Sequence, residues 1–177
     1  NKPVTVVIRE VLPATLLLTI TAKIIALVVG VPLGVYSGLR ERSFVDEASA
    51  FFSYFFTAIP GFFLAIIAVF FFAVRLRWFP ASGMNAYDKP GDPIDMLKHL
   101  ILPALVLGLL SIPAYVRYTR TAVLDVLRED YIRTARAKGL REGVVIRRHL
   151  LPNALMPLVT IIGLSLPGLI GSSVLIE

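Results

Sequence analysis

Residues 48–74 read ASAFFSYFFTAIPGFFLAIIAVFFFAV, a run of 27 residues that contains no charged side chain. A second uncharged run of the same length covers residues 150–176. A helix needs about 20 apolar residues to cross the hydrocarbon core of a bilayer. The two runs therefore indicate membrane-crossing helices, and they disfavour the alternative of a large soluble helical protein with buried core helices.

Two further segments carry the same signal over the rest of the chain. Residues 100–116 are uncharged, and residues 11–39 are interrupted only by Lys23. Hydrophobic residues make up 56% of the chain, above the roughly 45–50% of soluble domains. The sequence therefore predicts an all-α membrane protein, a polytopic transmembrane helix bundle forming a single domain over residues 1–177. The four spans are expected near residues 11–39, 48–75, 99–121 and 151–176.

The ends of the sequence and its lack of cysteine set limits on its class. The chain begins at Asn1 without the pattern of a signal peptide, and it stops at Glu177 just after an apolar run. We therefore expect a fragment of a longer chain with further helices. The absence of cysteine excludes a disulfide framework and a thiolate metal site.

The distribution of lysine and arginine predicts an orientation. Eleven of the 18 cations lie in residues 40–47 and 117–148, and six lie in the N-terminal stretch and residues 75–98. Positive charge favours the cytoplasmic side of a membrane. We therefore expect the loops at 40–47 and 122–150 to be cytoplasmic, and the N-terminal stretch and the 76–98 loop to face outward.

Polar side chains inside the expected spans are candidates for a transport pathway. A lysine at mid-membrane is costly unless it faces a partner, a cavity or water. The alternatives are that Lys23 extends to the interface along a tilted helix, and that each hydroxyl makes an ordinary hydrogen bond inside the bundle. The possible pathway-lining residues are Lys23, Tyr54, Thr57, Ser111 and Tyr115.

The stretch at residues 125–150, here named the coupling loop, is too polar to span a membrane but is patterned like a folded element. Asp130 is suited to cap a helix start, because its carboxylate can accept from free backbone N–H groups. Gly139 suits the left-handed conformation at a helix end. We predict a helix, a glycine turn and a second helix from Val144 to Leu150 at the membrane surface. A solvated basic loop is the alternative.

The run Arg133-Thr134-Ala135-Arg136-Ala137-Lys138-Gly139, followed after nine residues by His149-Leu150-Leu151-Pro152, resembles the EAA loop of binding-protein-dependent ABC permeases. The positions that match are Ala135, Gly139, Leu151 and Pro152, whereas Arg133, Thr134 and His149 depart from the family pattern. Three longer stretches resemble the dipeptide, oligopeptide and nickel branch, and most closely its first permease subunit. They are LPATLLLTITAKIIALVVGVPLGVYSGLRERSFVD (12–46), RLRWFPASG (75–83) and LPNALMPLVTIIG (151–163).

The resemblance implies a transmembrane permease subunit of an ATP-driven importer, with peptides as the expected cargo, that forms half of a translocation pathway. Its coupling loop would dock on a separate ATPase, and Asp130 or Glu129 could replace the family's glutamate. The implied partners are a second permease subunit, two cytoplasmic ATP-binding subunits that hold ATP and Mg, and an extracytoplasmic substrate-binding protein. The implied location is the cytoplasmic membrane of a bacterium or archaeon. The implied coupling residues are Asp130, Arg133, Thr134, Ala135, Gly139, Leu151 and Pro152.

Enzymatic chemistry has no sequence support in this chain. It contains no GxxxxGK[ST] phosphate-binding loop, so we expect no ATPase activity of its own. Its two histidines, His99 and His149, lie outside any HExxH spacing, so no metal site is expected. The alternative functions are a self-sufficient secondary transporter or channel that uses Lys23, and an intramembrane enzyme or scaffold. The residues do not select among dipeptides, oligopeptides, nickel complexes and oligosaccharides.

Overall fold

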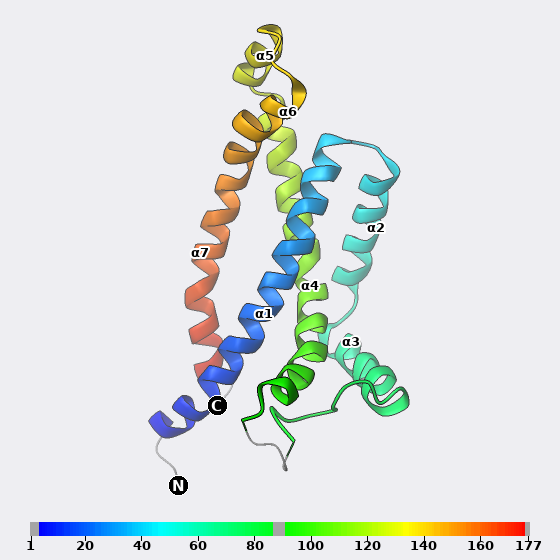
Figure 1. Cartoon of the computed structure of the whole chain (residues 1–177), viewed down its shortest axis with the longest axis vertical. Coiled ribbons are helices and arrows are strands. Elements are labelled where there is room, and N and C mark those ends of the chain that lie inside the picture. The colour runs from blue at the N-terminus through cyan, green and yellow to red at the C-terminus, as the bar shows by residue number, and fades with distance from the viewer. Residues whose placement is uncertain (1–3, 87–90, 176–177) are drawn as a thin grey trace. The chain divides into compact units, whose positions relative to one another are not determined.

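The computed structural model describes the backbone of residues 4–86 and 91–175, and the side chains of residues 12–86 and 91–163. Every regular element in that part of the chain is a helix, so the predicted all-α fold class is confirmed. Figure 1 shows the order of the elements. They are α1 (Val4–Leu39), α2 (Phe44–Ala58), α3 (Gly61–Ala68), the π-helix η1 (Val69–Arg75), α4 (Pro93–Leu127), α5 (Asp130–Ala137), α6 (Glu142–Val144), the π-helix η2 (Val145–Leu150) and α7 (Leu151–Leu175).

Two of these helices are long and apolar enough to cross a membrane. They are the Leu12–Leu39 part of α1 and the whole of α4, and α2 with α3 and η1 makes a third candidate if the pair is one broken span. The span expected near 151–176 corresponds to α7, whose side chains from residue 164 onward lie outside the described residues. Within the described residues, the apolar helices agree with the membrane fold that the sequence indicates.

The helix expected over residues 48–75 is interrupted at Ile59 and Pro60. Pro60 has an extended backbone (φ −59°, ψ 131°), and its carbonyl accepts hydrogen bonds from the N–H groups of Phe63 (3.0 Å) and Leu64 (3.2 Å). A proline has no N–H to donate and its ring clashes with the preceding turn of a helix. For this reason α2 ends before Pro60, and a new helix begins at Gly61.

The chain divides into two compact units. Unit 1 comprises Asn1–Ala26, Phe56–Ser111 and Pro167–Glu177, and unit 2 comprises Leu27–Phe55 and Ile112–Leu166. Each unit has a core of its own, and the coupling loop belongs entirely to unit 2.

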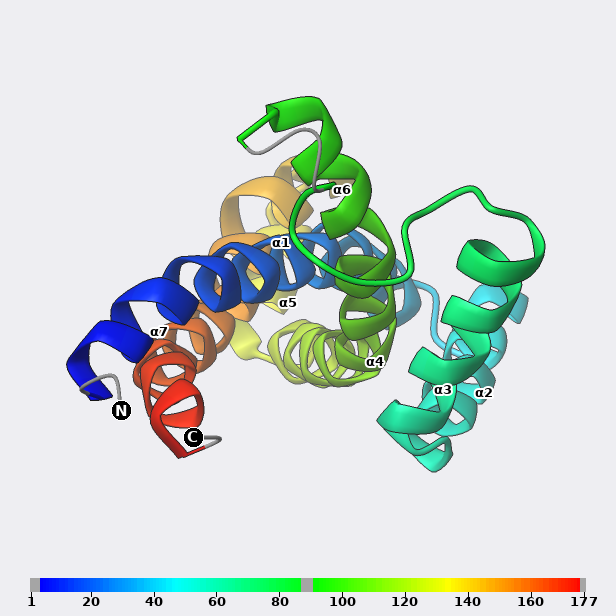
Figure 2. The ribbon, with the colours of Figure 1, turned by 90° about the horizontal axis from the view of Figure 1, so that it is seen from below.

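The core of unit 1 forms where α3 and η1 meet α4, around the buried side chains of Ala68, Leu102 and Val106. Figure 2 shows the loop that leaves η1 and leads back toward the start of α4. The N–H of Ala86 in this loop donates to Asp95 Oδ2 at 2.6 Å. The Asn85 amide donates to the carbonyl of Asp92 at 3.2 Å. These two bonds fasten the loop to the first turn of α4.

In unit 2, α1 and α4 pack along a glycine seam, defined here as Gly30, Gly34 and Gly38. A Cβ built on Gly34 would lie 2.6 Å from the Cβ of Thr119, and one on Gly38 would lie 2.6 Å from Cγ1 of Val123. Real Cβ atoms do not approach other atoms so closely, so the two backbones meet at a distance that only glycine permits. Small residues allow such close packing between membrane helices. The seam thereby holds the C-terminal half of α4, which leads into the coupling loop, against α1.

Candidate functional site

The coupling loop folds as a helix, a glycine turn and a second helix, as the sequence predicts. α5 ends at Ala137, and Gly139 adopts the left-handed conformation with φ +75°. Its N–H donates to the carbonyl of Arg136 at 2.9 Å, and the N–H of Leu140 donates to the carbonyl of Ala135 at 3.4 Å. Because a residue with a Cβ is strained at this φ, the glycine sets the direction in which the chain leaves α5.

The expected capping role of Asp130 is wrong. The N-cap position is occupied by Glu129, which has the extended backbone (φ −68°, ψ 143°) typical of such a residue and makes no side-chain capping bond. Asp130 is instead the first helical residue, and its side chain is 95% exposed. One of its carboxylate oxygens lies 3.4 Å from Nη1 of Arg133, one turn further along the helix. The carboxylate therefore pairs with a neighbouring cation rather than with the backbone.

The inner face of α5 is built into the core of unit 2. Ile132 is fully buried and Ala135 is 6% exposed. They pack with Val123 near the end of α4 and with Leu150 at the end of η2. Figure 1 shows α5 beyond the adjoining ends of α4 and of the helix that leads into α7. The short helix is therefore fixed to the ends of longer helices and is not a flexible tether.

The candidate coupling residues divide between the two faces of this structure. Ala135 packs against the chain's own core, and partly buried Leu151 lies against the same cluster. The other candidates are exposed. These exposed residues are Asp130, Arg133, Thr134, Gly139 and Pro152. A partner on the solvent side would therefore meet α5 through its outer face, while Ala135 and Leu151 hold the helix in place.

The outer face of the coupling loop is strongly basic. The Arg136 guanidinium donates to both carboxylate oxygens of Glu142, at 2.6 and 3.2 Å. This hydrogen bonding holds the pKa of the Glu142 carboxyl below its ordinary value of 4.5. The exposed carboxylates are Asp125, Glu129, Asp130 and Glu142, and the exposed cations are Arg128, Arg133, Arg136, Lys138, Arg141, Arg147 and Arg148. With seven cations to four carboxylates, the surface is complementary to an acidic protein surface.

The candidate pathway residues are divided between the two units. Lys23, Thr57 and Ser111 belong to unit 1, whereas Tyr54 and Tyr115 belong to unit 2. Tyr54 is 69% exposed on α2. Tyr115 is buried at the glycine seam, so its side chain offers little surface to a solute. Lys23 is partly buried in α1.

Several hydroxyls in the expected spans are used by their own helices. Thr19 donates to the carbonyl of Thr15, and Thr21 to that of Leu17, both at 2.7 Å. Ser111 donates to the carbonyl of Leu107 at 2.9 Å. Hydroxyls in membrane helices commonly donate a hydrogen bond to a backbone carbonyl of the preceding turn in this way. These bonds favour the structural interpretation of the polar positions over the pathway interpretation.

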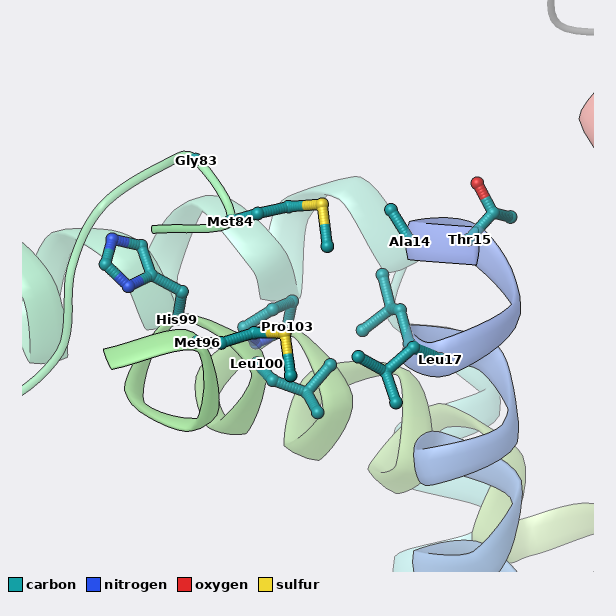
Figure 3. A pocket seen from close by; sticks show the side chains of 10 residues that line it. Ala14, Thr15, Leu17, Gly83, Met84, Met96, His99, Leu100 and Pro103 are labelled. Atoms are coloured by element: carbon teal, nitrogen blue, oxygen red, sulfur yellow. The ribbon is translucent and has the colours of Figure 1, made fainter. Parts of the chain in front are cut away.

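Unit 1 contains a largely apolar pocket of about 200 Å³ beside the loop between η1 and α4. Figure 3 shows Met84 from the loop, Met96 and Leu100 from α4, and Leu17 from α1 around it. The ring of His99 stands at its edge, with Nδ1 2.9 Å from the carbonyl oxygen of Asp95. Apart from this histidine and Thr15, the lining offers no side chain that could orient a polar ligand.

Sequence reasoning missed the polar contacts that hold α2. The side chains of α2 that are buried among the described residues are Asp46, Ser49 and Ser53. Asp46 receives two hydrogen bonds from the guanidinium of Arg120 on α4. The spacing of three and then four residues places the polar group on one helical face, so the signal was present. The spacing does not indicate the partner on α4, because Arg120 lies 74 positions further along the chain.

Comparison with known proteins identifies a family. Residues 30–177 match the family model described as the inner membrane component of binding-protein-dependent transport systems. Over 99% of its length the chain is 44% identical to the oligopeptide transport system permease protein AppB of Bacillus subtilis. Over its whole length it is 39% identical to the dipeptide transport system permease protein DppB of Alkalihalophilus pseudofirmus. It is also 38% identical to a putative peptide permease protein of Brucella suis.

The chain covers only part of these curated relatives, namely 55%, 59% and 56% of their respective lengths. The family match nevertheless extends from Gly30, in the last third of α1, to the end of the sequence and includes the whole coupling loop. The chain therefore belongs to the family of inner-membrane components of binding-protein-dependent transport systems.

Proposed function

We propose that this chain is part of a permease subunit of an ATP-driven importer and forms half of its translocation pathway. The names of its relatives, which are oligopeptide, dipeptide and peptide permeases, support peptides as the cargo. The family match favours this function over a self-sufficient transporter that uses Lys23.

The observation that carries the proposal is that α5 has one buried face and one exposed face. Its inner face is buried with Ile132 and Ala135 in the core of unit 2, and its outer face exposes Arg133 and Thr134. A helix held in this way can transmit a force from a partner on its outer side to the longer helices on its inner side. In the proposed function that partner is an ATPase subunit, and α5 with the turn at Gly139 docks on it.

The proposed complex contains a second permease subunit, two cytoplasmic ATP-binding subunits and an extracytoplasmic substrate-binding protein. ATP and Mg belong to the ATP-binding subunits, since this sequence has no phosphate-binding loop. Closure of the ATPases on ATP would move the coupling loops, and the helices would rock about a central site in an alternating-access cycle.

The proposed orientation places the basic loops in the cytoplasm of a bacterial or archaeal cell. The support is the excess of lysine and arginine in the loops at 40–47 and 122–150. This orientation puts α5 on the side where ATP is available. Among the candidates for the pathway, Tyr54 and Thr57 have exposed side chains.

The proposal is tested by reversing one exposed charge in the full-length subunit, assembled with its partners in proteoliposomes. Arg133→Glu changes a side chain that is 71% exposed and makes only a local ion pair with Asp130. Lys98→Glu, at an exposed position in the first turns of α4, is the matched control.

Arg133→Glu should lower peptide uptake about tenfold, as expected for a loss of roughly 1.4 kcal/mol in docking. The control should transport at nearly the parent rate. Uptake by Arg133→Glu at the parent rate, with the ATPase still bound, would show that the outer face of α5 is not the docking surface.

A further inference from the structure

A bidentate ion pair joins α2 to α4 inside unit 2. The guanidinium of Arg120 donates from Nε to Asp46 Oδ1 at 2.6 Å and from Nη2 to Oδ2 at 2.8 Å. The Asp46 side chain is 6% exposed and that of Arg120 is 31% exposed. The N–H of Arg42, whose φ of +61° is unusual for a residue other than glycine, adds a third bond to Oδ2 at 3.0 Å. The orientation of this carboxylate is therefore fixed by three donors.

The other buried contacts of α2 are polar as well. Ser49 Oγ lies 3.0 Å from Ser37 Oγ on α1, a hydrogen bond in which either hydroxyl can donate. Ser49 Oγ also lies in donating geometry 2.9 Å from the carbonyl oxygen of Asp46. The large apolar side chains of α2 are exposed, among them Phe44, Phe51 and Phe52. Within unit 2, α2 is thus held by directional hydrogen bonds, which specify one position along α4 more sharply than apolar contacts do.

The α4 end of this ion pair is rigidly connected to α5. Val123 lies three residues after Arg120 on the same helix, and it packs in the same buried cluster as Ile132 of α5. The glycine seam allows α1 to pack closely against α4 near Val123, which lies opposite Gly38. A displacement of α5 that carries this cluster with it would also move the segment of α4 that bears Arg120.

We infer that Asp46 and Arg120 are positioning residues that transmit movement of the coupling loop to α2. This inference rests on the proposed function, in which α5 is the element that the ATPase moves. The link runs from Ile132 through Val123 to Arg120, and from there through Asp46 to the helix that carries exposed Tyr54. Buried ion pairs add little net stability compared with apolar pairs of similar volume, but they can specify one arrangement of helices.

The first test measures whether α2 keeps its position on the coupling loop. The chain has no cysteine, so pairs of nitroxide labels can be placed at exposed Phe52 and Lys138 in the full-length subunit of the assembled transporter. Asp46→Asn removes the charge of the carboxylate. Asp46→Leu with Arg120→Met replaces the pair by apolar side chains, a change that buried pairs often tolerate without loss of folding. Glu47→Gln, at the neighbouring exposed position, is the control.

The parent and the Glu47→Gln variant should show one narrow distribution of label distances, and the two pair variants should show a broad or shifted one. An unchanged distribution in the folded double variant would overturn the inference. The label distances can be measured without transport activity, so they test the link between α5 and α2 independently of the proposed function. A parent complex that does not couple ATP hydrolysis to uptake would count against the proposed function and not against the link.

The second test separates a positioning role from a merely structural one. Peptide uptake and ATP hydrolysis are measured on the same proteoliposomes, and their ratio is taken. Both pair variants should lower the uptake per ATP hydrolysed about fivefold or more, the range typical of a lost coupling between sites. If the variants only reduce the amount of assembled complex and leave this ratio at the parent value, the residues are structural and the inference is wrong.

Discussion

Gly34 of α1 lies against Thr119 of α4 so closely that a Cβ at position 34 would stand 2.6 Å from the Cβ of Thr119. The carbonyl oxygen of Val116 would be 2.7 Å away from the same atom. Because one of these neighbours is backbone, the contact cannot be relieved by trimming a single side chain. The distance between the two helices at this level depends on the absence of a side chain at position 34.

We predict that Gly34→Ala destabilises the protein by about 1–3 kcal/mol, the usual cost of overpacking a well-packed interface. Thermal unfolding of the full-length subunit in detergent measures the change. Adding Thr119→Ala should restore little of the loss, because alanine keeps the Cβ of residue 119 and the Val116 carbonyl also remains. Gly143→Ala serves as the control, since no atom beyond its chain neighbours lies within 4 Å of a Cβ built there. An equal loss of stability in Gly143→Ala would show that the effect of Gly34→Ala does not come from the close packing of α1 against α4.

Ile132 should be the main anchor of α5. It is fully buried in the core that α5 shares with α4 and the start of α7. Ile132→Ala should cost about 2–5 kcal/mol through lost burial and a residual cavity. Hydrogen exchange measured over residues 130–137 should become faster in this variant. The same measurement on Tyr131→Ala, whose parent side chain is exposed, should change little, and equal acceleration in both would argue against a buried anchor.

Gly139 is expected to tolerate asparagine better than alanine. At φ +75° an alanine Cβ costs about 1–2 kcal/mol, whereas asparagine is several times more common in this region. The space around the position is open, so backbone conformation alone should set the order. Unfolding midpoints of the two variants provide the measurement. Equal midpoints for alanine and asparagine would mean that the turn adapts to the side chain.

The bond between Arg136 and Glu142 should make the glycine turn sensitive to acid. The pKa of Glu142 is lowered in the folded protein by the hydrogen bonds from Arg136. A carboxyl with a lowered pKa stabilises the fold above its ordinary pKa of 4.5 and loses that contribution as the pH falls through the lowered value. Since both side chains are largely exposed, the contribution is about 0.2–1 kcal/mol.

The local free energy of opening of residues 138–145, measured by hydrogen exchange, should therefore decrease when the pH is lowered from neutrality to below 4.5. The decrease should be absent in Glu142→Gln. If the parent and this variant show the same dependence on pH, the ion pair does not hold the turn.

Much of the fold follows from the sequence because burial in a membrane leaves long uncharged runs. The run at 48–74 and the patterned loop before Leu151 were sufficient to predict helices, a glycine turn and the family. Pro60 is evident in the sequence, but the sequence does not show that the helix ends there. A proline in a membrane helix can either kink it or end it, and tertiary contacts decide which of the two occurs.

The candidate site was only partly predictable. The motif pointed to α5, but it could not separate Ala135, which faces the core, from Thr134, which faces solvent. That distinction depends on which helices pack against the loop. The pair Asp46–Arg120 joins residues 74 positions apart, and no local pattern specifies such a contact. The cap was misassigned by one residue because Glu129 and Asp130 are both acidic and only the backbone angles distinguish them.

The most direct test of the central claim, that the outer face of α5 contacts an ATPase subunit, is cross-linking from a photoreactive amino acid in cells. The group is placed at exposed Lys138, next to the glycine turn, and at exposed Leu97 in α4 as a control. We predict a cross-link from position 138 to an ATP-binding subunit and none to that subunit from position 97. A full-length transporter in which position 138 gives no cross-link to an ATP-binding subunit, while uptake remains at the parent level, would contradict the account.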